Sequence, residues 1–190
     1  EDEARWLADH GADAVIAQGL EAGGHRGCFL TQDMTTQTGT MALVPRICAA
    51  VSVPVIAAGG IASSEGVRAA MTLGAAGVQI GTAFLLCPEA QTSALHRASL
   101  TSNASQHTAL TNVFTGRPAR SIVNRLVREV GPMTDAATAF PTAAGPVALL
   151  RAAAEARGSD DFTSLWSGQN TTGCRELPAA ELLQRLDPQC

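Results

Sequence analysis

The fold of this chain is decided by residues 14–27, which read AVIAQGLEAGGHRG. The apolar run 14–17 is typical of a strand buried in a parallel sheet. Glycines before and after His25 allow a sharp turn and let the backbone approach a ligand closely. We therefore predict a strand-end loop that holds His25 beside a bound molecule. The alternative is a tight turn whose histidine only caps or packs.

Strands and helices alternate on both sides of this loop. The apolar spacing predicts a helix over 2–11, and then strands and helices in turn over 13–17, 40–50, 53–58, 63–73 and 77–82. Strands that alternate with helices over short connections form right-handed parallel βαβ units. The chain is therefore predicted to have an α/β fold. The polar loop that runs from His25 to about Gly39 is long, which is unusual unless it has a function.

Two of the predicted strands end in glycine, at Gly59-Gly60 and at Gly81. Such ends expose backbone N–H groups, and a nearby helix N-terminus adds the positive end of a dipole. Together they make a phosphate site that needs no lysine. In (β/α)8 barrels this site lies in the loops after the last two strands. We therefore predict that the three strands are about the sixth, seventh and eighth of a barrel. The alternative is that these glycines serve close helix–strand packing.

Composition excludes several classes of function. The chain has 190 residues, 46% of them hydrophobic, which is enough for a core, and its net charge of −4 gives no electrostatic footprint for nucleic acid. No apolar run is long enough for a membrane span. Five widely spaced cysteines favour reduced thiols, a cytoplasmic location and no metal site. The chain has no lysine and no tyrosine, which excludes a Schiff base, a Walker-type lysine and a phenolic acid from within it.

The second half of the chain has a different sequence pattern. We predict helices over 89–100, 122–130 and 141–157, and a strand over 110–113 that leads to a turn at Gly116-Arg117. Residues 88–177 are assigned to a smaller second domain.

Five stretches of the chain, in order, resemble the nitronate monooxygenases, formerly called 2-nitropropane dioxygenases. These stretches are 17–27, 54–61, 77–85, 114–120 and 165–169. The glycine-glycine-histidine loop is shared chiefly with a relative, the flavin-dependent enoyl-acyl carrier protein reductase. Gln18 and the run 114–120 favour the monooxygenase.

The resemblance implies an FMN-binding TIM barrel with a smaller domain. Only about three of eight strands are present, so the chain is similar to the C-terminal part of that fold. The expected domains are a barrel part over 1–87, a substrate-covering domain over 88–177 and a helix returning to the barrel over 178–190. The expected partners are the missing N-terminal half of the barrel and a second copy in a homodimer.

The resemblance also implies the roles of individual residues. His25 becomes the candidate general base, because the unperturbed pKa of histidine, about 6.5, lies near working pH. Arg26 is expected to pair with a carboxylate or the loop backbone rather than to contact the substrate. Arg117 and Arg120 are expected either to face the cleft and attract an anion or to tie the small domain to the barrel. The residues expected to contact FMN are Gln18, Gly23, Gly60, Gln79, Ile80, Gly81 and Thr82.

The implied reaction is the oxidation of alkyl nitronates, and of nitroalkanes after His25 removes the α-proton, by O2 to carbonyl compounds and nitrite. Two alternatives remain open at this point. One is the enoyl reductase, which would oxidise NAD(P)H with an enoyl thioester. The other is a non-catalytic half-barrel that associates with another chain.

Overall fold

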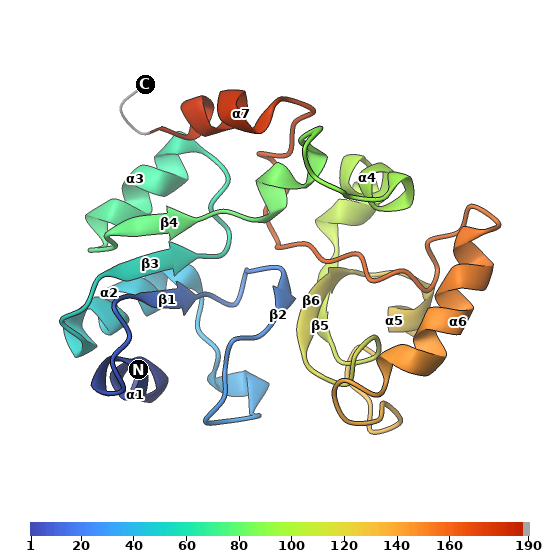
Figure 1. Ribbon diagram of the computed structural model, residues 1–190, viewed down its shortest axis with the longest axis horizontal. Coiled ribbons are helices and arrows are strands. Elements are labelled where there is room, and N and C mark those ends of the chain that lie inside the picture. The colour runs from blue at the N-terminus through green and yellow to red at the C-terminus, as the bar shows by residue number, and fades with distance from the viewer. Residues whose placement is uncertain (188–190) are drawn as a thin grey trace.

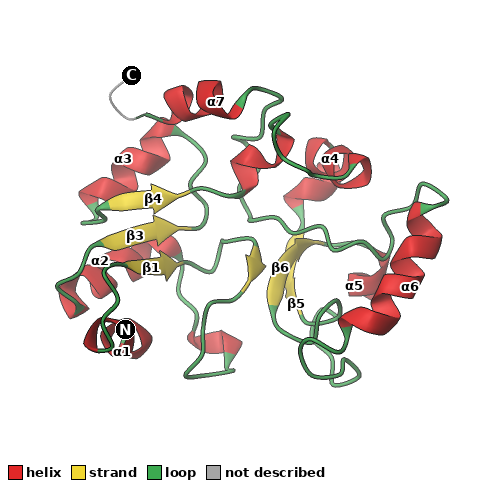
Figure 2. Cartoon of the chain, viewed as in Figure 1, coloured by secondary structure: helices red, strands yellow, loops and turns green. Residues whose placement is uncertain are grey.

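A computed structural model describes residues 1–187 and shows two small sheets side by side (Figure 1). The first sheet is parallel, with strands in the order β1-β3-β4, and the second is antiparallel, in the order β2-β6-β5. Figure 2 shows the helices gathered around the outside of both sheets. The strands are β1 (Val15–Gln18), β2 (Gly24–His25), β3 (Val55–Ala58), β4 (Gly77–Gln79), β5 (Thr108–Thr111) and β6 (Ala119–Ile122).

The parallel sheet confirms the predicted strand–helix alternation. In register, Val15 lies opposite Val55, and Ile56 lies opposite Gly77. Helix α2 packs against β1 and β3, α3 packs against β4, and α1 packs against α2 and β1. The helices of this half are α1 (Asp2–Asp9), α2 (Thr40–Ala50) and α3 (Ser64–Thr72).

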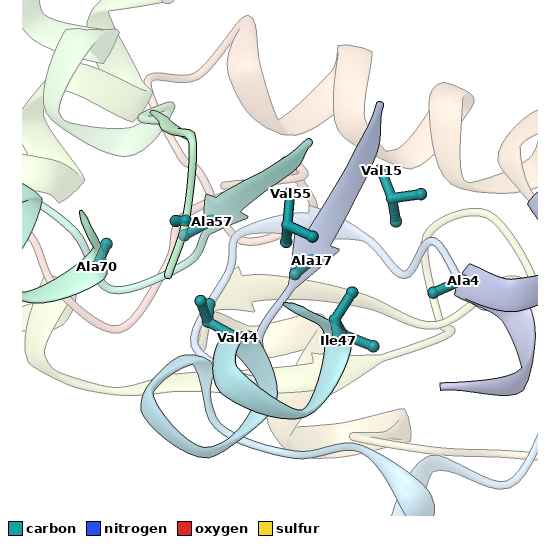
Figure 3. Close-up of a cluster of buried hydrophobic side chains, with 9 residues drawn as sticks. Ala4, Val15, Ala17, Val44, Ile47, Val55, Ala57 and Ala70 are labelled. Carbon is teal, nitrogen blue, oxygen red and sulfur yellow. The ribbon is translucent and has the colours of Figure 1, made fainter. Parts of the chain in front are cut away.

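One face of the parallel sheet holds the main core. Successive strand residues point to opposite faces, so Val15 and Ala17 are buried on the face that α2 covers, together with Val44 of that helix (Figure 3). Ile16, between the two, points to the other face and is 52% exposed. The sheet is therefore covered by helices on one side only.

Local signals fix the ends of α3 as the sequence predicts. The Ser63 hydroxyl accepts a hydrogen bond of 3.2 Å from the N–H of Gly66, which caps the first turn. Gly74 follows the helix with a φ of +102°, a left-handed conformation that ends it.

The second half contains four more helices, and short 3-10 turns occur in both halves of the chain. Helix α7 brings the chain back to α3, where Leu182 and Leu186 pack with Ala83 and Cys87. Residues 188–190 of the returning helix that the resemblance implies over 178–190 lie outside the described residues. The helices are α4 (Ala94–Thr101), α5 (Arg125–Val130), α6 (Ala144–Glu155) and α7 (Ala179–Leu186), and the 3-10 turns are η1 (Met34–Thr36), η2 (Thr82–Leu86) and η3 (Asn103–Gln106).

Several helix boundaries differ from those predicted, and at two of them a capping side chain sets the start. The helix predicted from residue 89 begins at Ala94, because the Ser93 hydroxyl accepts from the N–H of His96 and caps it there. The helix predicted from residue 122 begins at Arg125, because the Asn124 side chain caps it and the residues before it form β6. In both places a capping side chain sets the start that apolar spacing alone placed too early.

The two-residue strand β2 was predicted as part of a loop. It pairs with β6, with Gly24 opposite Arg120 and His25 opposite Ala119. The loop after β1 thus supplies the edge strand of the second sheet, which couples His25 to the second half of the chain.

Candidate active site

A cavity of about 230 Å³ opens at the carboxyl ends of β1, β3 and β4, the edge of a parallel sheet where ligands bind in open α/β folds. The structure brings all seven residues expected to bind the cofactor to its wall. They are Gln18, Gly23, Gly60, Gln79, Ile80, Gly81 and Thr82. The wall also includes Trp166, Gly168 and Asn170 from the second half of the chain.

The loops after β3 and β4 present unused donors to this cavity. Within the described residues, the backbone N–H groups of Gly60, Gly81 and Thr82 have no protein acceptor. Gly60 has a φ of +74° after Gly59 at +114°, a turn that favours glycine at both positions. The Thr82 hydroxyl accepts from the N–H of Gly168 at 2.9 Å and keeps its own hydrogen for donation. Neutral donors of this kind suit an anionic group such as a phosphate.

One segment of the second half, residues 166–170, closes the cavity; we call it the strap. It donates a hydrogen bond to each of the three strand-end loops. These run from Gln169 N to the Glu21 carbonyl at 2.9 Å, from Asn170 Nδ2 to the Gly60 carbonyl at 2.8 Å, and from Gly168 N to the Thr82 hydroxyl. The strap therefore holds the three loops in one arrangement.

The strap meets the first loop at two glycines. A Cβ on Gly23 would lie 2.5 Å from the Gly168 nitrogen, and one on Gly168 would lie 2.8 Å from the Glu21 carbonyl oxygen. Both sides of the contact between Gly23 and Gly168 consist of backbone atoms, so neither residue has room for a side chain. Sequence reasoning placed Gly23 against the cofactor, and in the structure Gly23 both lines the cavity and lies against the strap.

The Gln18 side chain holds the loop that carries His25. Its Nε2 donates to the His25 carbonyl at 3.0 Å, and its Oε1 accepts from the N–H of Gly27 at 2.7 Å. The amide thus bridges the base of the loop while Gln18 also lines the cavity.

Arg26 is the buried centre of the same loop and is 1% exposed. Its guanidinium donates to the carbonyls of Gly19 and Ala22, at 2.7 and 2.9 Å, and to Oε1 of Gln37 at 2.7 Å. Burial, and then the nearby charge of Arg120, lower the pKa of Arg26 to about 10, which leaves it charged at neutral pH. Of the two roles expected for Arg26, the structure shows the contact with the loop backbone.

The structure also decides between the two roles expected for Arg117 and Arg120. Arg117 donates to the carbonyls of Arg26 and Cys28, at 2.9 and 3.1 Å. Arg120, which is 4% exposed, donates to the carbonyl of Leu20 at 3.0 Å. Both arginines therefore tie the second sheet to the His25 loop.

The Glu21 carboxylate occupies the N-terminus of α2. It accepts hydrogen bonds from the backbone N–H of Thr40, at 2.8 and 3.0 Å, and from the Thr40 hydroxyl at 2.9 Å. A carboxylate at this end of a helix is favoured by the helix dipole. The side chain also packs beneath Gly60, where an added Cβ would touch the Glu21 Cβ at 3.4 Å.

His25 lies at the rim of the cavity, next to Trp166, but is not part of the cavity wall. Its ring centroid is 5.3 Å from that of Trp166 and 5.7 Å from that of Phe140. Its Nε2 lies 2.9 Å from the Thr115 hydroxyl oxygen. Partial burial, and then the positive charge of Arg117, lower the pKa of His25, so the imidazole is neutral at neutral pH and can accept a proton.

Sequence reasoning missed Thr115, Phe140 and Asn170 as parts of this site. Each comes from a segment far along the chain from the strand-end loops, so no local pattern linked it to them. Residues 1–187 contain no cluster of three potential metal-ligating side chains and no helix long and apolar enough to cross a membrane.

Comparison with known proteins identifies relatives of this chain. A family model described as nitronate monooxygenase matches residues 1–189. A nitronate monooxygenase of Pseudomonas aeruginosa is 46% identical over 190 residues, which cover 97% of this chain and 53% of that protein. A probable nitronate monooxygenase of Bacillus subtilis is 40% identical, with 97% and 54% covered. This chain spans about half the length of these curated relatives.

Solved structures show similar relatives. The nitroalkane oxidase from Streptomyces ansochromogenes superposes with a TM-score of 0.90 at 43% identity, covering 97% of this chain and 53% of that one. FabK from Thermotoga maritima superposes with a TM-score of 0.75 at 30% identity, covering 99% and 58%. By its sequence and its structure, the chain belongs to the nitronate monooxygenase family.

Proposed function

We propose that this chain forms the C-terminal part of an FMN-dependent nitronate monooxygenase, which uses O2 to oxidise alkyl nitronates to carbonyl compounds and nitrite. The observation that carries the proposal is the cavity at the strand ends, where the N–H groups of Gly60, Gly81 and Thr82 have no acceptor among residues 1–187. Family membership supports the same reaction class.

The residues present fit a flavin mononucleotide. Gly60, Gly81 and Thr82 would bind its phosphate through their backbone N–H groups. Gln79, whose side chain is exposed at the cavity wall, would donate to and accept from the ribityl chain or the ring. When bound, FMN would supply the redox chemistry, passing an electron from the nitronate to O2.

Gln18, Gly23 and Ile80 would shape the flavin site. Gln18 holds the loop backbone, and Gly23 lets the strap approach the loop. Ile80 contributes an apolar part of the wall.

We propose that His25 is the general base for nitroalkanes. Its lowered pKa keeps the ring neutral, and a neutral imidazole can take the α-proton. The two aromatic rings beside it, Trp166 and Phe140, provide apolar surroundings that suit an alkyl substrate. A nitronate has already lost this proton, so it needs His25 less.

The uncovered face of the parallel sheet supports the barrel assignment, with β1, β3 and β4 as about strands six to eight within 1–87. Ile16 is 52% exposed on this face, while Val15 and Ala17 on the other face are buried by helices. In a TIM barrel this inner face is filled by side chains from the remaining strands. Residues 88–177 would form the smaller domain, and 178–190 would return to the barrel, where α7 packs on α3.

The enoyl reductase alternative has weaker support. FabK matches at 30% identity and a TM-score of 0.75, against 43% and 0.90 for the nitroalkane oxidase. These likenesses favour the nitronate reaction.

The test is to purify the intact protein, release its cofactor by heat and identify that cofactor by mass. We expect one FMN per chain, together with O2 consumption and nitrite release on alkyl nitronates. FAD as the stoichiometric flavin would contradict the cofactor assignment. NAD(P)H oxidation with an enoyl thioester and without nitrite would select the reductase instead.

A further inference from the structure

We infer that Thr115 is a positioning residue for His25: its hydroxyl accepts a hydrogen bond from Nε2–H of the ring and leaves the lone pair on Nδ1 for proton removal. The inference rests on the proposed role of His25 as a base. Its structural part, the choice of tautomer, is independent of that role.

Thr115 lies on the connection between β5 and β6, 90 residues along the chain from His25. The residue after it, Gly116, has a φ of +84°. A Cβ on Gly116 would lie 2.1 Å from the Thr138 carbonyl oxygen, so the neighbouring loop packs directly on its Cα. This packing fixes the turn, and with it the position of the Thr115 hydroxyl.

A hydroxyl has one hydrogen to donate and two lone pairs to accept with. The Thr115 oxygen lies 2.9 Å from His25 Nε2, 3.3 Å from the Arg117 carbonyl oxygen and 3.4 Å from the Arg117 nitrogen. A carbonyl can only accept, so the hydroxyl hydrogen goes to the Arg117 carbonyl. The two lone pairs then accept from the Arg117 N–H and from His25 Nε2–H. This assignment gives Nε2–H, the Arg117 N–H and the Arg117 carbonyl a partner each, whereas donation from the hydroxyl to Nε2 would leave the Arg117 carbonyl without that hydrogen.

The other ring nitrogen of His25 is available. No described residue forms a hydrogen bond with Nδ1. Trp166 and Phe140 pack beside the ring and hold its plane. Since the partner of one imidazole nitrogen decides which nitrogen carries the proton, the bond to Thr115 places the basic lone pair on Nδ1.

The bond also matters after proton transfer. When Nδ1 takes a proton, Nε2–H remains bonded to Thr115, and a hydrogen bond from a charged donor is stronger than one from a neutral donor. Thr115 therefore stabilises the protonated ring.

Of the charged groups around the ring, Arg117 opposes the stabilisation of the protonated imidazole. On the same turn, Arg117 lowers the pKa of His25. Arg26, the residue after β2, and Arg120, on β6, donate to loop carbonyls. The loops that carry Phe140 and Trp166 bring aromatic rings to His25. Thr115 is thus the neutral partner that offsets the charge of Arg117.

Nuclear magnetic resonance can read the tautomer directly. The chain has four histidines, so two-bond ¹H–¹⁵N spectra of the intact protein with ¹⁵N-labelled histidine rings will be sparse, and His25→Asn assigns the His25 signals by their loss. We expect Nε2 to carry the proton in the wild-type protein at pH 8. A proton on Nδ1 would overturn the inference without any variant at Thr115.

Variants then test the role of the hydroxyl. In Thr115→Val we expect a mixture of tautomers, a lower pKa for His25 and a roughly tenfold lower kcat/KM for a nitroalkane, with little change for the matching nitronate. Thr115→Ser keeps the hydroxyl and should restore the Nε2–H tautomer and the pKa. Thr101→Val is the matched control, because that hydroxyl bonds only to carbonyls of its own helix.

The outcomes separate the two proposals. An unchanged tautomer and pKa in Thr115→Val would overturn the inference. A shifted tautomer with equal losses on nitroalkane and nitronate would support the role of Thr115 in orienting the ring and would overturn the role of His25 as the base.

Discussion

The side-chain amide of Asn170 donates a hydrogen bond of 2.8 Å to the backbone carbonyl of Gly60, across 110 residues of sequence. The Asn170 Oδ1 is fixed in turn by the N–H and hydroxyl of Thr172, at 3.1 and 2.7 Å. The carbonyl of Gly60 is thereby held by the strap, and the N–H of Gly60 has no acceptor in the part of the chain that the structure describes. Asn170 thus connects the strap to the glycine that we propose binds the cofactor phosphate.

Replacing Asn170 by Ala should weaken FMN binding. The loss of one neutral hydrogen bond is worth roughly 1 kcal/mol, or about fivefold in the dissociation constant. The measurement is a fluorescence titration of FMN into the flavin-free intact protein. Asn103→Ala is the matched control, since that exposed side chain lies on η3, outside the cavity. Equal affinities for the Asn170 variant and the wild type would remove Asn170 from the phosphate site.

Replacing Gly23 by Ala should destabilise the fold. The added Cβ would lie 2.5 Å from the Gly168 nitrogen and 2.6 Å from the Ser167 carbonyl carbon, so the loop or the strap must move. We expect the free energy of unfolding to fall by about 1–3 kcal/mol, as for other overpacked sites. Urea unfolding measures it. Gly145→Ala in α6, where a Cβ meets open space, should leave stability unchanged or raise it. A Gly23→Ala protein as stable as the wild type would show that the loop and strap can separate freely.

The strand–helix–strand order of the first half could be predicted from the sequence because its signals are local. The apolar run 53–58, the cap at Ser63 and the stop at Gly74 each act within a few residues, and the structure bears them out. The convergence of the strand ends then follows from the rule that parallel strands end at one edge. This is why all seven expected cofactor residues meet at one cavity.

The rest of the site depends on contacts between distant segments, which no local pattern encodes. The strand β2 has two residues and therefore no periodicity, and it exists because β6 pairs with it. The bond between His25 and Thr115 joins residues 90 positions apart. The sequence left the roles of Arg117 and Arg120 open for the same reason. The local sequence around an arginine does not show whether its side chain binds an anion or a distant backbone carbonyl.

Replacing Arg26 by Leu should cost much stability. The change would leave the carbonyls of Gly19 and Ala22 without their buried donor. Each unsatisfied buried acceptor costs roughly 1–3 kcal/mol, so we expect a loss of at least about 2 kcal/mol in thermal or urea unfolding. Arg46→Leu is the control, because Arg46 is exposed and its surface ion pair with Glu1 should contribute little to stability. Similar small losses in both variants would show that Arg26 does not hold the loop together.

Replacing His25 by Asn separates a base from a packing residue. Asn keeps polarity but cannot take a proton at neutral pH, so kcat/KM for a nitroalkane should fall by about 10²–10⁴-fold, the usual contribution of a positioned base. The matching nitronate has already lost the proton, and its oxidation should fall far less. Flavin content must be equal in the two preparations for this comparison to hold.

The pH dependence of the wild-type protein provides an independent check on the same residue. Burial and Arg117 lower the pKa of His25 below its ordinary value of 6.5, so the ring stays neutral down to lower pH than a free histidine does. For a nitroalkane, kcat/KM should therefore fall on the acid side with an apparent pKa below 6.5, and this limb should vanish in His25→Asn. An acid limb that persists unchanged in His25→Asn would assign proton removal to another group.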